Sequence, residues 1–284
     1  MAERKFRILM LHGYAQSASL FRIKTRLLRE QILDSFPPAL YDEYPGGIEY
    51  LFPDGAVSLS TNSKDSGDDD HEDGMRAWWL NLDDTSRYTF LNETIASLPT
   101  YLNHTPIDAL IGFSQGGALA VMLASLCEAA ASSPSQARRQ SLRDQGIPVD
   151  AFLNGLPGQS PLRFVISLCG FRGTMDYYGS LYPAVGLTTP SLHAMGVFDS
   201  MIAGPKSQEL VASFQSPQVV HYYGGHFIPR DRQTMQTIVA FIKAHFLVQK
   251  YQAENNPNPN PTASVRARRK FVPFRVRVSH RIIV

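Results

Sequence analysis

The sequence has few cysteines, no long apolar run and no net positive charge outside its C-terminal end. Two of its 284 residues are cysteine, which argues against a disulfide scaffold and favours a reducing, cytoplasmic location. No run of eighteen apolar residues occurs, so no membrane-spanning helix is expected. The apolar stretch at residues 8–11 is too short for the core of a signal peptide. Hydrophobic residues make up 44% of the chain, which is enough for one large core and excludes a disordered protein.

The net charge of +2 comes from the C-terminal end of the chain. Residues 263–284 hold seven arginines and lysines and no acidic residue. Without those seven, 20 of the 27 basic residues remain against 25 acidic ones, so residues 1–262 carry about −5. An acidic main body offers no basic surface for DNA or RNA, so nucleic acid is not an expected partner.

Short apolar segments alternate with amphipathic ones between residues 1 and 250. The segments typical of buried strands are residues 7–11, 48–52, 109–112, 164–168, 191–195 and 219–222. Apolar residues at helical spacing occupy residues 21–32, 87–102, 116–131, 206–214 and 230–246. This alternation predicts an α/β fold with a mostly parallel central sheet and helices on both faces.

Three other segments interrupt or follow this pattern. Residues 62–74 are rich in Asp, Ser and Gly, which indicates a solvated loop, and their acids lack a recognised metal-ligand spacing. Residues 132–161 are polar, with scattered Pro and Gly, and are interpreted as an insertion or cap. The Asn-Pro repeat at residues 255–261 cannot hold a helix or a paired strand. We therefore expect a folded domain at residues 1–250 and a disordered linker and basic tail at residues 251–284.

The segment Gly112-Phe113-Ser114-Gln115-Gly116 matches the pattern G-x-S-x-G. In α/β-hydrolases this pattern forms a tight strand-to-helix turn that exposes a nucleophilic serine. Side chains at the two glycine positions would collide with the neighbouring strand and helix, and the backbone of the serine is strained. Because a predicted strand precedes the motif and a predicted helix follows it, the sequence predicts that Ser114 is a nucleophile in an α/β-hydrolase fold.

A nucleophilic serine needs a base, and the base needs an acidic partner. In α/β-hydrolases these residues follow the serine in the order acid, then histidine. Asp199 comes just after the predicted strand at residues 191–195, and His226 follows the strand at residues 219–222. The sequence therefore predicts a catalytic triad of Ser114, Asp199 and His226.

Other histidines and acids fit these roles less well. His193 and His221 lie inside predicted strands, and His12 is placed to brace the loop that follows the first strand. Asp176 and Asp231 are the alternative acids.

Acyl transfer also needs two backbone N–H groups that bind the developing oxyanion. One is expected from Gln115, the residue after the nucleophile, and the other from Tyr14, in the loop after the first strand. Gly13 permits the close backbone turn that this role requires.

Aromatic residues are candidates for an apolar groove that binds the acyl group. These are Trp78, Trp79, Phe171 and Phe227. The alternative is that one of the two tryptophans packs in the core and the other partly covers it. An apolar groove would favour an aliphatic or aryl acyl group over a highly polar one.

Taken in order, five motifs resemble the FSH family of serine hydrolases over about residues 5–248. They are Leu11-His12-Gly13-Tyr14-Ala15-Gln16-Ser17, Arg76-Ala77-Trp78-Trp79, Gly112-Phe113-Ser114-Gln115-Gly116-Gly117, Phe198-Asp199 and Gly224-Gly225-His226-Phe227-Ile228-Pro229. The resemblance implies an α/β-hydrolase fold and esterase or thioesterase activity. It matches Ser114, Asp199 and His226 to the triad, and Tyr14 and Gln115 to the oxyanion donors. Fungal members of the family include enzymes that release polyketide chains from a synthase carrier domain.

We therefore expect a serine hydrolase that works through an acyl-enzyme and requires no cofactor or metal. The first hypothesis is a thioesterase that releases a polyketide or other acyl chain, with a carrier protein or a polyketide synthase as partner. The alternatives are a carboxylesterase acting on small free esters and a non-catalytic, hydrolase-like binding protein.

Overall fold

The computed structural model describes residues 3–40, 42–59, 74–82, 86–130 and 135–254. The chain divides into two units, residues 1–248 and residues 249–284. The described elements that surround the candidate site belong to the first unit. The expected tail at residues 255–284, and the acidic loop up to residue 73, lie outside the described residues.

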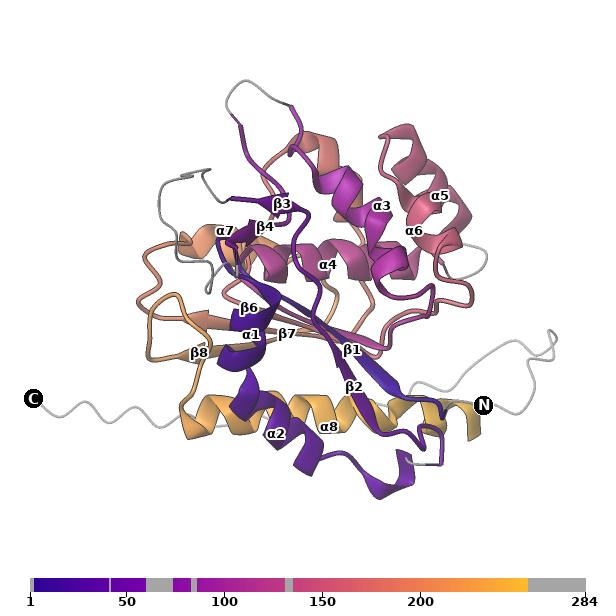
Figure 1. The fold of residues 1–284 in the computed structure, drawn as a ribbon, viewed down its shortest axis with the longest axis vertical. Helices are drawn as coiled ribbons and strands as arrows, with labels where there is room; N and C mark the ends of the chain where they lie inside the picture. Colours follow the sequence, from indigo (N-terminus) through magenta and orange to yellow (C-terminus); the bar gives the residue numbers. More distant parts are fainter. Residues whose placement is uncertain (1–2, 41, 60–73, 83–85, 131–134, 255–284) are drawn as a thin grey trace, which may run out of the picture. The chain divides into compact units, whose positions relative to one another are not determined.

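A six-stranded parallel sheet runs through the first unit, in the order β2-β1-β5-β6-β7-β8 (Figure 1). Its strands are β1 (Phe6–Leu11), β2 (Ile48–Leu51), β5 (Ala109–Phe113), β6 (Phe164–Leu168), β7 (Ser191–Gly196) and β8 (Pro217–Tyr222). A separate antiparallel pair is formed by β3 (Val57–Ser58) and β4 (Arg76–Ala77). The six predicted strands and their parallel arrangement are thus confirmed.

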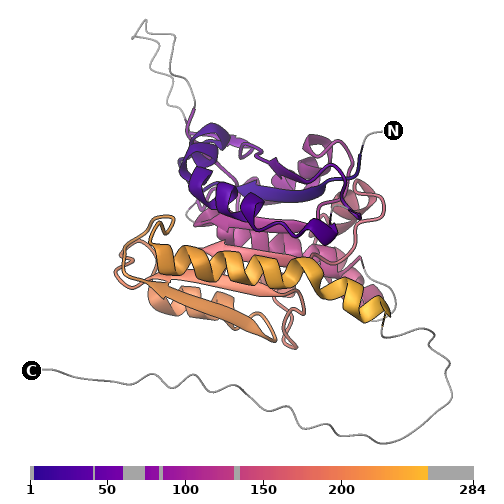
Figure 2. The ribbon, with the colours of Figure 1, turned by 90° about the horizontal axis from the view of Figure 1, so that it is seen from below.

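Helices cover both faces of the sheet, and Figures 1 and 2 show α1, α2 and α8 on the face opposite α3 and α4. The helices are α1 (Ala18–Lys24), α2 (Arg26–Asp34), α3 (Leu91–Tyr101), α4 (Gln115–Glu128), α5 (Ser135–Asp144), α6 (Val149–Asn154), α7 (Gly204–Val211) and α8 (Arg232–Glu254). Two short 3-10 helices, η1 (Pro38–Leu40) and η2 (Asp176–Leu181), complete the described elements. The predicted α/β architecture is confirmed.

The alternation of side chains along β1 explains why the chain has two hydrophobic cores. Phe6, Ile8 and Met10 pack with α1, α2 and α8, whereas Leu9 and Leu11 pack with α3 and α4. Successive side chains of a strand point to opposite faces, so the apolar residues of β1 supply both cores. Every residue of β1 is buried.

The predicted insertion at residues 132–161 contains α5 and α6 in its described part. Helix α6 contacts α3 and α4, and α5 contacts α6 and η2. Neither helix was predicted: α5 is polar and carries few apolar residues, and α6 is only six residues long. No helix of the described residues is both long enough and apolar enough to cross a membrane.

Candidate active site

The turn between β5 and α4 places Ser114 at the carboxyl edge of the sheet. Ser114 adopts φ 53° and ψ −116°, a conformation that costs a residue with a side chain about 1–3 kcal/mol. A Cβ atom at Gly112 would overlap the backbone of Gly116, and one at Gly116 would overlap the backbone of Leu11 at the end of β1. The two glycines therefore allow strand, turn and helix to pack this closely.

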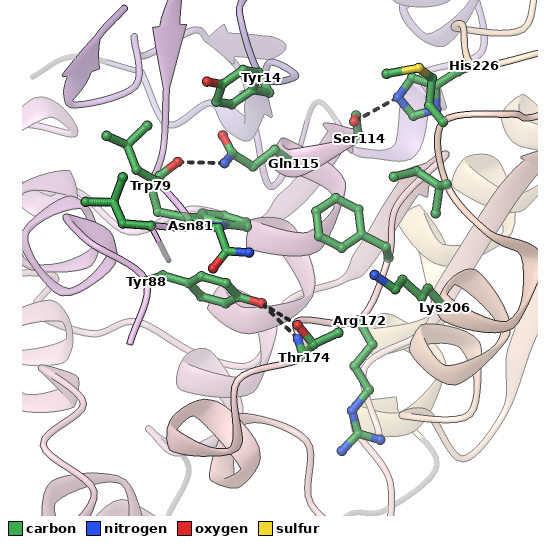
Figure 3. A pocket seen from close by; sticks show the side chains of 15 residues that line it. Tyr14, Trp79, Asn81, Tyr88, Ser114, Gln115, Arg172, Thr174, Lys206 and His226 are labelled. Atoms are coloured by element: carbon green, nitrogen blue, oxygen red, sulfur yellow. Dashed lines mark hydrogen bonds between the residues drawn. The ribbon is translucent and has the colours of Figure 1, made fainter. Parts of the chain in front are cut away.

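Three side chains from separate elements meet at this turn. His226 Nε2 lies 2.8 Å from Ser114 Oγ, and His226 Nδ1 lies 2.8 Å from Asp199 Oδ2 (Figure 3 shows the pair Ser114 and His226). With a proton on Nδ1, the imidazole donates to Asp199, and its free Nε2 can accept the serine proton. Residues separated by 112 and 27 positions in the chain thus form one hydrogen-bonded relay.

The Asp199 carboxylate is held from two directions. Its Oδ2 faces His226, while its Oδ1 accepts hydrogen bonds from the N–H groups of Met201 at 2.9 Å and Ile202 at 3.0 Å. Burial alone would raise the pKa of Asp199, but the hydrogen bonds from His226 and the two backbone groups bring that pKa below its usual value. The Asp199 carboxylate is therefore ionised at neutral pH.

The loop of His226 is fastened by a tyrosine at the end of β8. The Tyr222 hydroxyl lies 2.8 Å from the carbonyl oxygen of Gly225 and 2.5 Å from that of Phe227. The Cys169 thiol lies 2.9 Å from the same hydroxyl oxygen. These contacts connect β6 and β8 to the residues on either side of His226.

Two backbone N–H groups beside Ser114 are open to a ligand. Gln115 is the first residue of α4, where an N–H has no partner within the helix. The loop that contains Tyr14 passes close to the serine, because a Cβ at Gly13 would lie 2.8 Å from the Phe113 ring and 3.4 Å from Ser114 Cβ. Within the described residues, neither the Gln115 N–H nor the Tyr14 N–H donates a hydrogen bond to the protein.

The side chain of Gln115 has a role that the sequence did not reveal. Its Oε1 accepts from the Trp78 N–H and its Nε2 donates to the Trp79 carbonyl, both at 2.9 Å (the second is drawn in Figure 3). The buried amide thereby holds the segment after β4 beside the start of α4. No sequence pattern marks a glutamine for such a contact.

His12 holds the segment after β4 in place and does not contact the reacting groups. Its Nε2 accepts from the Gly55 N–H at 2.9 Å, so its proton is on Nδ1, which faces the Gly13 carbonyl. Burial lowers its pKa, so the ring is neutral. The ring stacks on Trp78, whose indole N–H donates to the His12 carbonyl at 2.7 Å. This agrees with the prediction that His12 braces its loop.

Two cavities open from Ser114. The first, here called the aromatic cavity, measures about 460 Å³ and is lined in part by Trp79, Tyr88 and Phe171 (Figure 3). The second, called the Lys24 cavity, measures about 490 Å³, and Phe227 is among its lining residues. Tyr14, Ser114, Met201 and His226 line both.

The four predicted substrate residues therefore lie in different places. Trp79 and Phe171 line the aromatic cavity, and Phe227 lines the Lys24 cavity. Trp78 lines neither cavity, because its side chain is buried against His12. Described residues of the predicted cap, 135–161, also line neither cavity.

The alternative histidines and acids serve other parts of the fold. Buried His193 lies 3.2 Å from Ser191 Oγ and packs on the Phe214 ring. The Asp231 carboxylate accepts from the Thr234 N–H at the start of α8. Asp176 is the first residue of η2.

A metal ion would have to compete with the relay. Cys169 Sγ, an Asp199 oxygen and a His226 nitrogen lie within 4.8 Å of one another. Both ring nitrogens of His226 already face Ser114 and Asp199, and burial raises the pKa of the Cys169 thiol to about 11. A protonated thiol is a poor metal ligand. The arrangement of Ser114, His226 and Asp199 therefore suits hydrogen bonding among these three residues better than metal binding.

The parallel sheet, the turn at Ser114 and the hydrogen bonds among Ser114, His226 and Asp199 together define a serine hydrolase with the α/β-hydrolase fold. The chain belongs to the serine hydrolase (FSH1) family, whose model matches residues 1–238. It is 28% identical over 263 residues to "Esterase OVCA2" of Danio rerio, covering 86% of this chain and 99% of the relative. The esterase of the same name from Homo sapiens is 30% identical over 260 residues, covering 85% and 97%.

A yeast relative and two solved structures extend this comparison. "Family of serine hydrolases 2" of Saccharomyces cerevisiae is 29% identical over 245 residues, covering 83% of this chain and 97% of the relative. Arabidopsis thaliana SOBER1 superposes with a TM-score of 0.51 at 18% identity, covering 85% and 99% of the two chains. Zea mays acyl-protein thioesterase 2 superposes with a TM-score of 0.51 at 16% identity, covering 86% and 95%. These two structures share the fold of the chain.

Proposed function

We propose that Ser114, His226 and Asp199 are the catalytic triad of this serine hydrolase. His226 Nε2 removes the Ser114 proton as Oγ attacks the carbonyl carbon of an ester or thioester. Asp199 keeps the ring in the required tautomer and stabilises the imidazolium that forms. The observation that carries the proposal is the pair of 2.8 Å contacts that His226 makes to the other two residues.

The remaining steps follow from the surroundings of Ser114. The N–H groups of Tyr14 and Gln115 bind the oxyanion of the tetrahedral intermediate. His226 then returns its proton to the leaving alcohol or thiol, which departs as the acyl-enzyme forms. Water, activated by the same imidazole, releases the acid and frees Ser114.

We propose the aromatic cavity as the acyl site and a thioesterase acting on a polyketide or other acyl chain as the activity. Trp79, Tyr88 and Phe171 supply apolar surface that stabilises an aliphatic or aryl acyl group. A carrier domain, such as that of a polyketide synthase, would then present the thioester. The second candidate, a carboxylesterase acting on small esters, is supported by the esterase relatives.

We propose the hydrolase domain at residues 1–250, as the sequence predicts, and a cytoplasmic location. Both cysteines are unpaired and buried, which supports a reducing compartment. Membership in a serine hydrolase family argues against the non-catalytic alternative.

An active-site probe tests the triad, and a matched substrate pair tests the activity. A fluorophosphonate should label the wild-type protein and leave Ser114→Ala unlabelled while both remain folded by circular dichroism. The absence of labelling in the folded wild type would refute the enzyme mechanism. Comparing kcat/KM for a thioester and an oxygen ester of the same long acyl group then separates the two activities. Slow turnover of both, beside fast turnover of small esters, would favour the carboxylesterase.

A further inference from the structure

Both cavities beside Ser114 carry positive charge. Lys24 and Arg230 line the Lys24 cavity, and Arg172 and Lys206 line the aromatic cavity. No Asp or Glu lines either cavity within the described residues. Residues 1–262 carry a net negative charge by sequence. The positive charge around Ser114 therefore differs in sign from the net charge of the domain. A positively charged cleft raises the local concentration of an anionic substrate.

The cations of the Lys24 cavity are available to a ligand. Lys24 is half-buried at the end of α1, and Arg230 is exposed just before α8. In the described part of the chain, neither side chain forms an ion pair or a side-chain hydrogen bond. By contrast, the Arg172 guanidinium lies 4.8 Å from the centre of the Tyr182 ring.

The position of His226 distinguishes the leaving-group side from the acyl side. In Figure 3, Trp79 and Tyr88 lie on the side of Ser114 away from His226. Three residues that follow His226 in the chain, Phe227, Ile228 and Arg230, line the Lys24 cavity. A leaving group that takes its proton from Nε2 departs on the His226 side. His226 lines both cavities, but the residues that follow it line only the Lys24 cavity, which makes that cavity the candidate site for the leaving group and the aromatic cavity the candidate site for the acyl group.

We propose that the leaving group of the natural substrate carries a phosphate that Lys24 and Arg230 bind. This assignment rests on the proposed acyl-transfer function and adds the chemical class of the alcohol or thiol. A phosphate group offers up to two negative charges and three acceptor oxygens. These match one lysine ammonium group and the paired N–H donors of one arginine guanidinium. The phosphate itself does not react. The Ser114 oxygen forms a bond to the acyl carbon, the carbon–sulfur or carbon–oxygen bond breaks, and the proton passes through His226 to the departing atom.

Two matched substrate pairs test this assignment for either kind of ester. The first is hexanoyl-CoA against the hexanoyl thioester of N-acetylcysteamine, and the second is hexanoyl glycerol 3-phosphate against hexanoyl glycerol. We expect the wild type to favour the phosphorylated member by at least about tenfold in kcat/KM, with a preference that shrinks as salt rises. In the double variant Lys24→Gln/Arg230→Gln, the kcat/KM ratio should fall to about one in the pair that the enzyme turns over.

Three controls make the result decisive. Lys243→Gln changes an exposed cation on α8, away from the cavities, and should leave the ratio as in the wild type. An unchanged ratio in the double variant overturns the assignment. So does a ratio that falls only in Arg172→Gln/Lys206→Gln, which would place the phosphate of the leaving group in the aromatic cavity. If the folded protein hydrolyses neither member of either pair and takes no fluorophosphonate, the acyl-transfer function itself fails.

Discussion

Tyr222 holds the loop of His226 from both sides. Its hydroxyl contacts the carbonyl oxygens of Gly225 and Phe227, the two neighbours of His226, from the end of β8. The imidazole is thereby fixed by three groups: Asp199, Ser114 and, through its own backbone, Tyr222. Removing this hydroxyl frees the loop without touching the reacting atoms.

The variant Tyr222→Phe should therefore lower kcat by about tenfold and change KM little, because a displaced base weakens the transition state more than substrate binding. Its melting temperature should fall by only a few degrees, as expected for the loss of one buried hydrogen bond. Steady-state kinetics beside Tyr223→Phe, a change in the exposed neighbouring ring, measure the effect. An unchanged kcat in Tyr222→Phe would show that the Tyr222 hydroxyl is not needed to position His226.

The Gly13→Ala variant probes the proposed oxyanion donor at Tyr14. The added Cβ would lie 2.8 Å from the Phe113 ring and would push the loop away from Ser114. We expect kcat to fall by about 10²-fold, because an oxyanion donor acts only when it is correctly placed. Gly204→Ala is the matched control, since a Cβ there meets nothing within 4 Å. Equal kcat values for both variants would remove the Tyr14 N–H from the mechanism.

The Gln115 side chain gives a prediction about stability. Gln115→Ala leaves the Trp78 N–H and the Trp79 carbonyl without their partners, both in a buried setting. The free energy of unfolding should fall by about 2–6 kcal/mol, since two buried groups lose their partners and each such loss costs about 1–3 kcal/mol. Urea denaturation beside Gln208→Ala, a change at an exposed glutamine of α7, gives the difference. A loss below about 0.5 kcal/mol, the range of ordinary surface substitutions, would contradict the structural role.

The burial of His193 leads to a prediction about how the free energy of unfolding depends on pH. Burial lowers its pKa to about 4, whereas an unfolded histidine titrates near 6.5. Between these values the unfolded chain binds the additional proton, so stability falls as the pH falls, by up to about 1.4 kcal/mol per pH unit from this residue. Denaturant unfolding from pH 7.5 to 4.5 should show a steeper decline for the wild type than for His193→Gln. Parallel profiles would mean that His193 is not held neutral.

Local rules explain what the sequence revealed. Gly112 and Gly116 predicted the turn at Ser114, because a larger residue at either position would overlap the backbone of α4 or β1. Asp199 and His226 followed from the chain order and from the strands that precede them. The central strands were equally clear, since burial on both faces leaves few polar positions in β1, β5 and β6.

Features that depend on contacts between residues far apart in the chain could not be predicted from the sequence. Trp78 and Trp79 are neighbours, and only the packed fold shows that the first stacks on His12 while the second lines the aromatic cavity. Lys24 and Arg230 come from opposite ends of the domain, so their shared cavity appears only in three dimensions. Helix α5 was missed because it has few apolar residues, and helix α6 because its buried Val149, Phe152 and Leu153 span too short a segment to show a helical pattern.

Mass spectrometry of the protein during turnover of a slowly hydrolysed aryl ester tests the central claim most directly. Acid quenching within the burst phase should trap one acyl group, and peptide mapping should place it on Ser114. The adduct should be absent from Ser114→Ala and should decay at the rate of steady-state turnover. Steady hydrolysis with an unmodified Ser114, or with the acyl group on another residue, would contradict the account.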